Sequence, residues 1–576
     1  MVSKMYKEMY SRWLAANLDD PDLKPELESI QNDDAAIQDR FAVALKFGTA
    51  GLRGVIGAGT NRMNVYVVRQ ATQGLANWVK TQGGTQTVAI SYDSRIKSDV
   101  FAKAAAEVLA ANGVKVRIYS ALMPVPALSF ATRYYNCNAG IMVTASHNPA
   151  KYNGYKAYGP DGCQMTDEAA DIVYAEIQKT DILTGAKTMP FAEGLEKGII
   201  EYVGDDCINA LYEAIEARSI RPGICKTAGL KLVYSPLNGS GLVPVTHVLH
   251  DIGITDITVV PEQEKPDGNF PTVAYPNPES PKAFELALAL AKKVDADIVL
   301  ATDPDADRLG VYCKDTKSGQ YVSFTGNMSG MLIAEYILKE RTATGTMPQD
   351  PALVETIVTT DMAKVIAEAY GVKLIEVLTG FKYIGEQIRL FEENHTYHYV
   401  FGLEESYGCL AGTYARDKDA CVAVMMLCEV ASWYKKQGKT LWDAMLDMYE
   451  TYGYFKEGLE TITLKGMDGA EQIQQMMADA RENLPQAIGD YKVLAVRDYK
   501  TDLRIDMADG SKSPTGLPTS NVLYYELEDH AWCCVRPSGT EPKIKFYFGV
   551  KGASLADAED KLEDLTKGMM ALFDRK

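Results

Sequence analysis

Ser146 and His147 stand side by side in the polar stretch 144–149 (TASHNP), directly after the apolar run Ala139–Val143. That run has the length of a buried strand and is too short for a helix. Lys156 follows in the stretch 152–156 (YNGYK). We expect a hydroxyl, an imidazole and an amine on one loop at the carboxyl end of a strand, where open α/β sheets bind ligands. Because a serine hydroxyl is a weak nucleophile at pH 7, Ser146 needs a base, a metal or prior phosphorylation. The alternative is a loop whose polar side chains cap their own backbone.

Three carboxylates, Asp303, Asp305 and Asp307, alternate in the stretch 303–308 (DPDADR). Alternate carboxylates in a tight loop can converge on one hard cation. A calcium EF-hand would need Gly at the sixth position and Glu at the twelfth, where this chain has Arg308 and Lys314. The pattern therefore favours Mg²⁺ shared with a phosphate, because Mg²⁺ keeps few protein ligands. The alternative is a solvated acidic turn, which would hold three like charges together without a cation.

Four further loops carry groups suited to phosphates and sugars. Arg53 lies in the glycine-rich stretch 47–54 (FGTAGLRG), where glycines let the backbone approach an anion and the arginine attracts it. Lys382 stands near the start of a predicted helix, and both the lysine and the helix N-terminus attract anions. Glu404 and Ser406 lie in 402–408 (GLEESYG) and can hydrogen-bond to a polyhydroxy ligand. The last loop, between two strands, has the composition of a phosphate cradle: Arg536, Ser538, Gly539 and Thr540. Taken singly, each loop also fits an ordinary turn or helix cap.

The elements around these loops alternate between strand and helix. The pattern predicts a strand over Thr87–Tyr92, a helix over 100–112, a strand over 114–119, a helix over 126–134 and then the strand before Ser146. Such alternation indicates a mainly parallel sheet. Two more α/β units are predicted, after 221–223 and from about residue 323. The last unit differs, with antiparallel strands over 522–526, 532–535 and 543–550 and a final amphipathic helix capped by Ser554.

Composition limits the class of protein. The chain has 576 residues and a net charge of −18, which disfavours general binding to nucleic acid or anionic membranes. It contains no apolar run near the ~18 residues of a membrane-spanning helix, and its first residues lack the apolar core of a signal peptide. They predict an amphipathic helix with Met5, Met9, Trp13 and Leu14 on one face. The ten cysteines show no C-x-x-C pair, so a reduced, cytoplasmic protein is expected.

Six motifs in one order, FGTAGLRG, TASHNP with YNGYK, DPDADR, TGFKYIGE, GLEESYG and RPSGTEPK, resemble those of the α-D-phosphohexomutases, most closely the phosphoglucomutase/phosphopentomutase branch. The resemblance runs from Phe47 to the C-terminal helix. It implies a heart-shaped α/β enzyme with a central cleft, made of three related mixed α/β domains and a C-terminal α+β domain with helices on a sheet. The expected domains are 1–204 with the phosphoserine loop, 205–322 with the metal loop, 323–452 with the sugar loop and 453–576 with the phosphate loop.

The same resemblance implies a role for each motif residue. Ser146 would carry the phosphoryl group and, with Asp303, Asp305 and Asp307, would hold Mg²⁺. Lys156 matches the candidate general base, so a lowered pKa is expected for it from burial and neighbouring cations. The other catalytic matches are Arg53, His147, Arg308 and Lys382. Glu404 and Ser406 match the sugar-recognition pair, with Glu405 as the alternative carboxylate. Arg536, Ser538, Gly539 and Thr540 match the loop that holds the non-transferring phosphate.

The implied activity is interconversion of glucose 1-phosphate and glucose 6-phosphate, with glucose 1,6-bisphosphate as intermediate and activator and no obligate protein partner. Ribose or deoxyribose phosphate and mannose or amino-sugar phosphates remain alternative substrates. Two alternatives come from other classes. A metal-dependent phosphomonoesterase would release inorganic phosphate and would not need the sugar pair. A non-catalytic sugar-phosphate-binding protein would not need Ser146 and the three aspartates, all of which are present.

Overall fold

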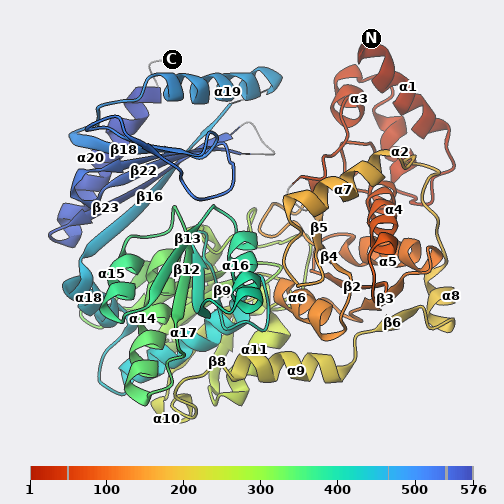
Figure 1. Cartoon of the computed structure of the whole chain (residues 1–576). Helices are drawn as coiled ribbons and strands as arrows, with labels where there is room; N and C mark the ends of the chain where they lie inside the picture. The colour runs from red at the N-terminus through yellow and green to blue at the C-terminus, as the bar shows by residue number, and fades with distance from the viewer. Residues whose placement is uncertain (1, 49–50, 465, 539–542, 574–576) are drawn as a thin grey trace. The chain divides into compact units, whose positions relative to one another are not determined.

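The computed structural model describes residues 2–48, 51–464, 466–538 and 543–573. Its contacts divide the chain into two units; Figure 1 labels their helices and strands. The first consists of Met1–Gly326, Gly385–Asn394 and Ser406–Thr440, and the second of Asn327–Ile384, His395–Glu405 and Leu441–Lys576. No helix among these described ranges is both long and apolar enough to cross a membrane.

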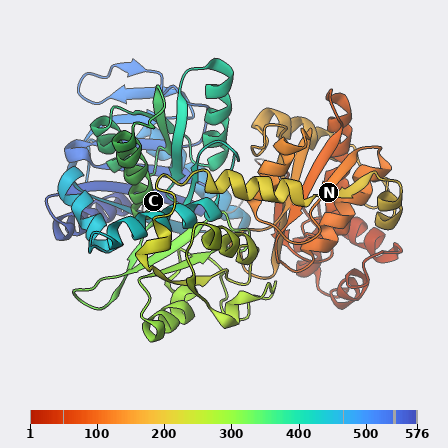
Figure 2. The ribbon, with the colours of Figure 1, turned by 90° about the horizontal axis from the view of Figure 1, so that it is seen from below.

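The first sheet of the first unit has the strand order β1-β5-β4-β2-β3-β6. Its parallel strands are β2 (Thr87–Tyr92), β3 (Lys115–Ile118), β4 (Ala139–Val143) and β6 (Ile200–Tyr202). The antiparallel pair β1 (Gly51–Val55) and β5 (Tyr152–Tyr158) lies at one edge. The helices around it are α4 (Val65–Thr81), α5 (Ser98–Ala111), α6 (Val125–Tyr134), α7 (Asp167–Gln178) and α8 (Phe191–Glu196) (Figure 2). The predicted alternation of strand and helix before Ser146 is confirmed.

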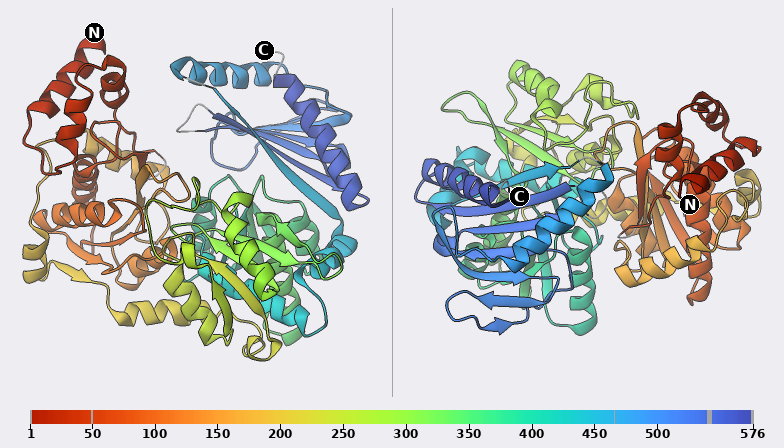
Figure 3. Two further views of the ribbon diagram at one scale, coloured as in Figure 1. Left: turned by 180° about the vertical axis from the view of Figure 1, so that it is seen from behind. Right: turned by 90° about the horizontal axis from the view of Figure 1, so that it is seen from above.

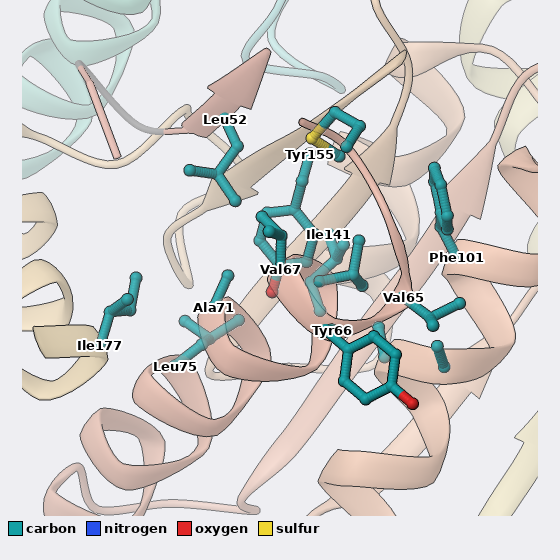
Figure 4. Packing of buried hydrophobic residues seen from close by; sticks show 14 of the residues in the cluster. Leu52, Val65, Tyr66, Val67, Ala71, Leu75, Phe101, Ile141, Tyr155 and Ile177 are labelled. Carbon is teal, nitrogen blue, oxygen red and sulfur yellow. The ribbon is translucent and has the colours of Figure 1, made fainter. Parts of the chain in front are cut away.

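Apolar side chains from the strands and from α4 form the core of this sheet. Figure 4 shows Leu52, Ile141 and Tyr155 of the strands gathered against Val67 and Ala71 of α4. Tyr155 and Ile141 are fully buried.

Lys156 is a strand residue of β5, opposite Met142 of β4, and the expectation that it shares a loop with Ser146 is wrong. The reason is that 152–158 pairs with β1 on one side and β4 on the other, and these pairing partners lie outside the stretch itself.

The second sheet has the strand order β11-β10-β9-β7-β8. Three strands are parallel: β7 (Lys231–Ser235), β8 (Asp256–Val259) and β9 (Ile298–Thr302). β10 (Leu309–Lys314) and β11 (Tyr321–Phe324) complete it in antiparallel fashion. The helices of this part are α9 (Asp205–Glu216), α10 (Cys225–Ala228), α11 (Leu242–Asp251), α12 (Pro261–Glu264), η1 (Pro281–Phe284), α13 (Glu285–Val294) and α17 (Ala420–Lys435). β9 and β10 follow each other in the chain and pair antiparallel, and the loop that connects them holds the three aspartates.

The second unit begins with the helix α14 (Gly326–Thr344) and a third parallel sheet. β12 (Pro351–Thr356) pairs with both β13 (Lys373–Val377) and β14 (His398–Glu404). Further helices of this unit are α15 (Met362–Ala369) and α18 (Leu441–Tyr452). The helix α16 (Phe381–Asn394) begins in this unit, but its residues 385–394 belong to the first unit, as does the short strand β15 (Gly408–Ala411) that follows β14 in the chain. This matches the third predicted α/β unit.

The C-terminal part of this unit is a sheet with helices on one face. Its strand order is β16-β23-β22-β21-β18-β19-β20, and these pairs are antiparallel. The strands are β16 (Tyr454–Thr463), β17 (Ala487–Ile488), β18 (Tyr491–Asp498), β19 (Leu503–Asp506), β20 (Lys512–Ser513), β21 (Leu523–Leu527), β22 (Trp532–Pro537) and β23 (Lys543–Gly552). Figure 3 shows α19 (Gly466–Glu482) and α20 (Leu555–Phe573) along one face. The Ser554 hydroxyl accepts the backbone N–H of Asp557, which confirms the predicted cap.

Of the N-terminal helices, α1 (Val2–Ala15) packs against α2 (Leu23–Ser29) and α3 (Asp34–Phe41) and contacts α4 through Trp13. Trp13 is fully buried, and its ring meets those of Phe41 and Tyr66 edge-on at 5.9 and 5.5 Å. Met5 is 67% exposed, so the predicted face is wrong at that residue. The buried face is aromatic, with Tyr6 and Tyr10 joining Trp13 at helical spacing.

We predict that Trp13→Ala destabilises the first unit by about 3–5 kcal/mol, the cost of removing a fully buried aromatic ring. Thermal unfolding followed by circular dichroism measures the loss. Met5→Ala on the same helix is the control and should leave the unfolding midpoint unchanged. Equal midpoints for the two variants would contradict the packing of α1 on α4.

Candidate functional site

The loop after β4 holds Ser146 in an unusual backbone conformation. Its φ is +50°, and the side chain is only 3% exposed. The backbone N–H of Ser146 donates to Thr144 Oγ1 at 2.8 Å. Ser146 Oγ donates to Asp303 Oδ2 at 3.0 Å and lies 3.2 Å from His147 Nδ1. Strained backbone of this kind persists where the surroundings over-determine it, and it is common at functional sites.

A buried arginine that the sequence interpretation did not assign to the site holds this loop. Arg95 Nη1 donates to the carbonyl oxygens of Pro149 and Tyr152, both at 3.0 Å. Its Nη2 donates to those of Ser146 and Asn148. Arg95 is paired with Asp93 at 3.5 Å, and neither side chain is exposed. The available signal was the stretch 93–95 (DSR) at the carboxyl end of β2, which neighbours β4 in the sheet.

The three aspartates are buried together, and one carboxylate oxygen from each lies within 4.8 Å of those from the other two. Asp303 Oδ1 accepts the backbone N–H groups of Asp307 and Arg308 at 3.1 and 3.0 Å. Asp305 Oδ1 and both carboxylate oxygens of Asp307 have no hydrogen-bond partner among the described residues. Buried polar atoms without partners are rare in proteins. An all-oxygen donor set with open lone pairs fits a hard divalent cation.

Two lysines face this acidic cluster. Lys156 Nζ lies 3.1 Å from Asp305 Oδ2 and 3.7 Å from Asp307 Oδ2. Lys418 Nζ lies 3.2 Å from Asp307 Oδ2. Sequence reasoning missed Lys418, although the dense charge of 416–419 (RDKD) before α17 was a usable signal. The two ammonium groups partly balance three buried carboxylates.

The electrostatics of the cluster correct one expectation. Burial lowers the pKa of Lys156, but the carboxylates of Asp305 and Asp307 outweigh burial and raise the pKa above its usual value. The predicted lowering is therefore wrong for the chain alone, because acidic rather than cationic neighbours dominate. Burial followed by the charge of Asp305 raises the pKa of Asp303 and of Asp307. The pKa of Asp305 shifts in the opposite direction. Burial disfavours its ionised form, but the charge of Lys156 and the hydrogen bonds to Asp303 and Lys156 outweigh burial and lower the pKa.

The surroundings of His147 favour its neutral form. Burial lowers its pKa well below the usual value, and the guanidinium groups of Arg308 and Arg53 add to the shift. Arg308 Nη1 donates to Glu279 Oε1 at 2.6 Å, with Nε 3.9 Å from Asp307 Oδ1. Arg53 is exposed on β1, and its Nη1 donates to Asn148 Oδ1 at 3.3 Å. Both arginines therefore flank the Ser146 loop, where an anionic group would meet them.

The first unit thus brings together Arg53, Ser146, His147, Lys156, Asp303, Asp305, Asp307 and Arg308. Ser406 belongs to the same unit: the carbonyl of the next residue, Tyr407, accepts the N–H of Leu309 at the start of β10.

The remaining predicted residues lie in the second unit. Lys382 is the second residue of α16, with Nζ 4.8 Å from the ring centroid of Tyr383. Arg536 lies on β22 opposite Lys545, and the N–H of Ser538 donates to the carbonyl of Lys543 at 2.7 Å. Gly539 and Thr540 fall outside the described residues.

The sugar-loop carboxylates of this unit differ in their surroundings. Glu404 ends β14 and is 6% exposed. Glu405 Oε2 accepts the hydroxyl of Thr356 at 3.2 Å. Burial, followed by the charge of Glu404, raises the pKa of Glu405 to about 7.

Comparison with known proteins agrees with this organisation. Three family models match in chain order: phosphoglucomutase/phosphomannomutase alpha/beta/alpha domain I over residues 44–183, domain II over 208–318 and domain III over 325–452. The C-terminal sheet follows the third.

Relatives and solved structures extend the match to nearly the whole chain. A phosphoglucomutase of Staphylococcus aureus is 35% identical over 538 residues, which cover 92% of this chain and 94% of that protein. The structure of a phosphoglucomutase/phosphomannomutase family protein from Burkholderia thailandensis has a TM-score of 0.65 at 21% identity, covering 91% of this chain and 97% of that one. The parafusin (phosphoglucomutase) structure from Paramecium, in its open form, has a TM-score of 0.67 at 17% identity, covering 92% and 96%. With the domain models in chain order and a relative at this identity, the chain belongs to the phosphoglucomutase/phosphomannomutase family.

Proposed function

We propose that this mutase interconverts glucose 1-phosphate and glucose 6-phosphate through phosphorylated Ser146 and a glucose 1,6-bisphosphate intermediate. The observation that carries the proposal is the 3.0 Å approach of Ser146 Oγ to Asp303, within a cluster of buried carboxylates of which three oxygens have no hydrogen-bond partner among the described residues. The identity to the S. aureus phosphoglucomutase supports glucose phosphate over other sugars.

The proposed reaction has two phosphoryl transfers. In the first, the 6-hydroxyl oxygen of glucose 1-phosphate bonds to the phosphorus on Ser146 and its proton passes to a base, while the bond from phosphorus to Oγ breaks and Oγ takes up a proton. The bisphosphate then changes its orientation in the site. In the second transfer, Ser146 Oγ gives up its proton and bonds to the phosphorus at position 1, the bond from that phosphorus to the sugar oxygen O1 breaks, and O1 takes up a proton. This regenerates phosphoserine and releases glucose 6-phosphate. Phosphoryl transfer of this kind depends on in-line positioning and charge stabilisation more than on covalent help from the protein.

The residues around Ser146 suit these steps. Asp303, Asp305 and Asp307, with a phosphoserine oxygen, would hold Mg²⁺, which when bound supplies positive charge to the carboxylates and to the transferring group. Arg308 and Arg53 would contact the same phosphoryl oxygens. Neutral His147, 3.2 Å from Ser146 Oγ, is placed to exchange the serine proton. Lys156 would take the sugar proton once the charge of its two carboxylate neighbours is compensated.

The other predicted loops would bind the sugar ring and the phosphate that is not transferred. Glu404 and Ser406 would bind ring hydroxyls common to both orientations of the bisphosphate. The hydrogen bond of Glu405 to Thr356 supports Glu404 as the sugar-binding carboxylate. Lys382 and the loop of Arg536, Ser538, Gly539 and Thr540 would hold the phosphate that is not transferred.

The proposed domains are 1–204, 205–322, 323–452 and 453–576, and the three family models fall inside the first three. The cytoplasm is the proposed compartment. All ten cysteines are buried free thiols, which supports a reducing environment.

We predict that Ser146→Ala lowers kcat by about 10³-fold or more, because the group that carries the phosphoryl is lost. Intact-mass measurement after incubation with glucose 1,6-bisphosphate should show one phosphoryl group on the natural protein and none on the variant. Ser94→Ala, a change in the same domain, is the control and should keep both the phosphoryl group and the kcat of the natural protein. A phosphorylated, active Ser146→Ala protein would rule out the phosphoserine route.

Asp305→Asn keeps the size of the side chain and removes one proposed metal ligand. We expect kcat to fall by about 10²-fold or more, with a higher Mg²⁺ concentration needed for half-maximal rate. A coupled assay over a Mg²⁺ series measures both. Asp315→Asn, on an exposed turn after β10, should match the natural protein. An unchanged Mg²⁺ requirement in Asp305→Asn would place the metal elsewhere.

Substrate choice is tested by a panel of glucose, mannose and ribose 1-phosphates with a catalytic amount of glucose 1,6-bisphosphate. We expect the highest kcat/KM for glucose 1-phosphate and no net release of inorganic phosphate. A higher kcat/KM for ribose 1-phosphate would assign the pentose reaction instead, and phosphate release without an isomerised product would indicate a phosphatase.

A further inference from the structure

A second cluster of metal-ligating side chains lies in the first unit, where α9 packs against α11. Glu216 is the last residue of α9, and Asp251 is the last residue of α11. His247 stands one helical turn before Asp251. One ligand atom from each of the three side chains lies within 4.8 Å of the other two. None of the three takes part in the proposed reaction.

The position of the two carboxylates opposes the helix dipoles. The C-terminal end of a helix carries partial negative charge, so a carboxylate there is unfavourable and a cation is favourable. The C-terminal ends of α9 and α11, each with a carboxylate, lie next to each other here. The charged groups that act on Glu216 are Asp251 and Glu213, both negative. Among the described residues, no Lys or Arg forms an ion pair with Glu216 or Asp251. In the described part of the chain, the basic group beside this concentration of negative potential is the imidazole of His247.

His247 adds a nitrogen ligand with a defined orientation. Its Nε2 lies 3.3 Å from Asp251 Oδ2. The ring of Tyr212, from α9, stacks on the imidazole with centroids 4.1 Å apart and planes inclined by 31°. Tyr212 is buried, so this contact holds the imidazole against the α9 side of the cluster. His247 and Asp251, four residues apart, project from the same face of α11.

We propose that Glu216, His247 and Asp251 form a second metal site, which binds a divalent transition-metal cation such as Zn²⁺. One imidazole and two carboxylates are the mixed nitrogen and oxygen set that Zn²⁺ and its first-row neighbours accept. Mg²⁺ prefers oxygen ligands alone. We therefore expect Mg²⁺ at the three aspartates and the transition metal at Glu216, His247 and Asp251. A cation here balances both helix termini and joins α9 to α11 across their packed faces.

The test uses the full chain in excess Mg²⁺, which keeps the aspartate triad occupied while Zn²⁺ binding is measured by equilibrium dialysis. The variant is His247→Ala. The matched control is His250→Ala, which removes an exposed histidine from the same helix and outside the cluster. We expect the natural protein and His250→Ala to bind one more Zn²⁺ per chain than His247→Ala. Glu216→Gln should weaken this binding by at least about tenfold, since even outer-sphere partners contribute that much.

Two further readouts separate binding from folding. Zn²⁺ should raise the thermal midpoint of the natural protein and of His250→Ala but not of His247→Ala, because a ligand stabilises the state that binds it. Co²⁺ in place of Zn²⁺ should give a visible absorption spectrum that His247→Ala loses. Equal Zn²⁺ stoichiometry and affinity in the two histidine variants would overturn the proposal. So would a natural protein that binds no Zn²⁺ under excess Mg²⁺.

Discussion

The structure around Ser146 depends on one electrostatic constraint: three carboxylates are buried within reach of one another at the end of β9. Like charges in a low-dielectric environment repel strongly, and burial itself disfavours ionisation. Lys156 and Lys418 offset part of this charge, yet Asp305 Oδ1 and both oxygens of Asp307 have no hydrogen-bond partner among the described residues. In the proposed mechanism a cation would complete the balance, and the serine hydroxyl 3.0 Å from Asp303 lies where a phosphoryl group would share that cation.

The first sheet positions that serine through backbone contacts. Gly154 of β5 passes so close that a Cβ there would lie 2.4 Å from the carbonyl oxygen of Thr144 and 2.8 Å from that of Leu52. Only glycine permits β1, β5 and the Ser146 loop to meet in this way. Arg95 then holds four carbonyl oxygens of the loop and its neighbours. A buried guanidinium acts as a rigid clamp because its donors form a planar fork.

Much of this arrangement could be predicted from the sequence, because the informative signals are local. An apolar run before TASHNP predicts β4, and alternate aspartates predict a cation site whatever the fold. Three features could not be predicted in the same way. The local sequence predicts Lys156 on a loop with a lowered pKa, but its partner on β1 and the acidic side chains around it come from distant parts of the chain. Arg95 and Lys418 carry no motif of their own. The buried face of α1 is set by Phe41 and Tyr66, which its own sequence does not contain.

The central claim is that Ser146 and the three aspartates share one divalent cation, and a crystal structure with Mn²⁺ in place of Mg²⁺ tests it most directly. Anomalous scattering locates Mn²⁺ without reference to the protein atoms. The account predicts a peak bonded to oxygens of Asp303, Asp305 and Asp307, with a Ser146 oxygen or its phosphoryl oxygen completing the ligands. A peak away from this cluster, or Ser146 turned away from the three carboxylates, would contradict it.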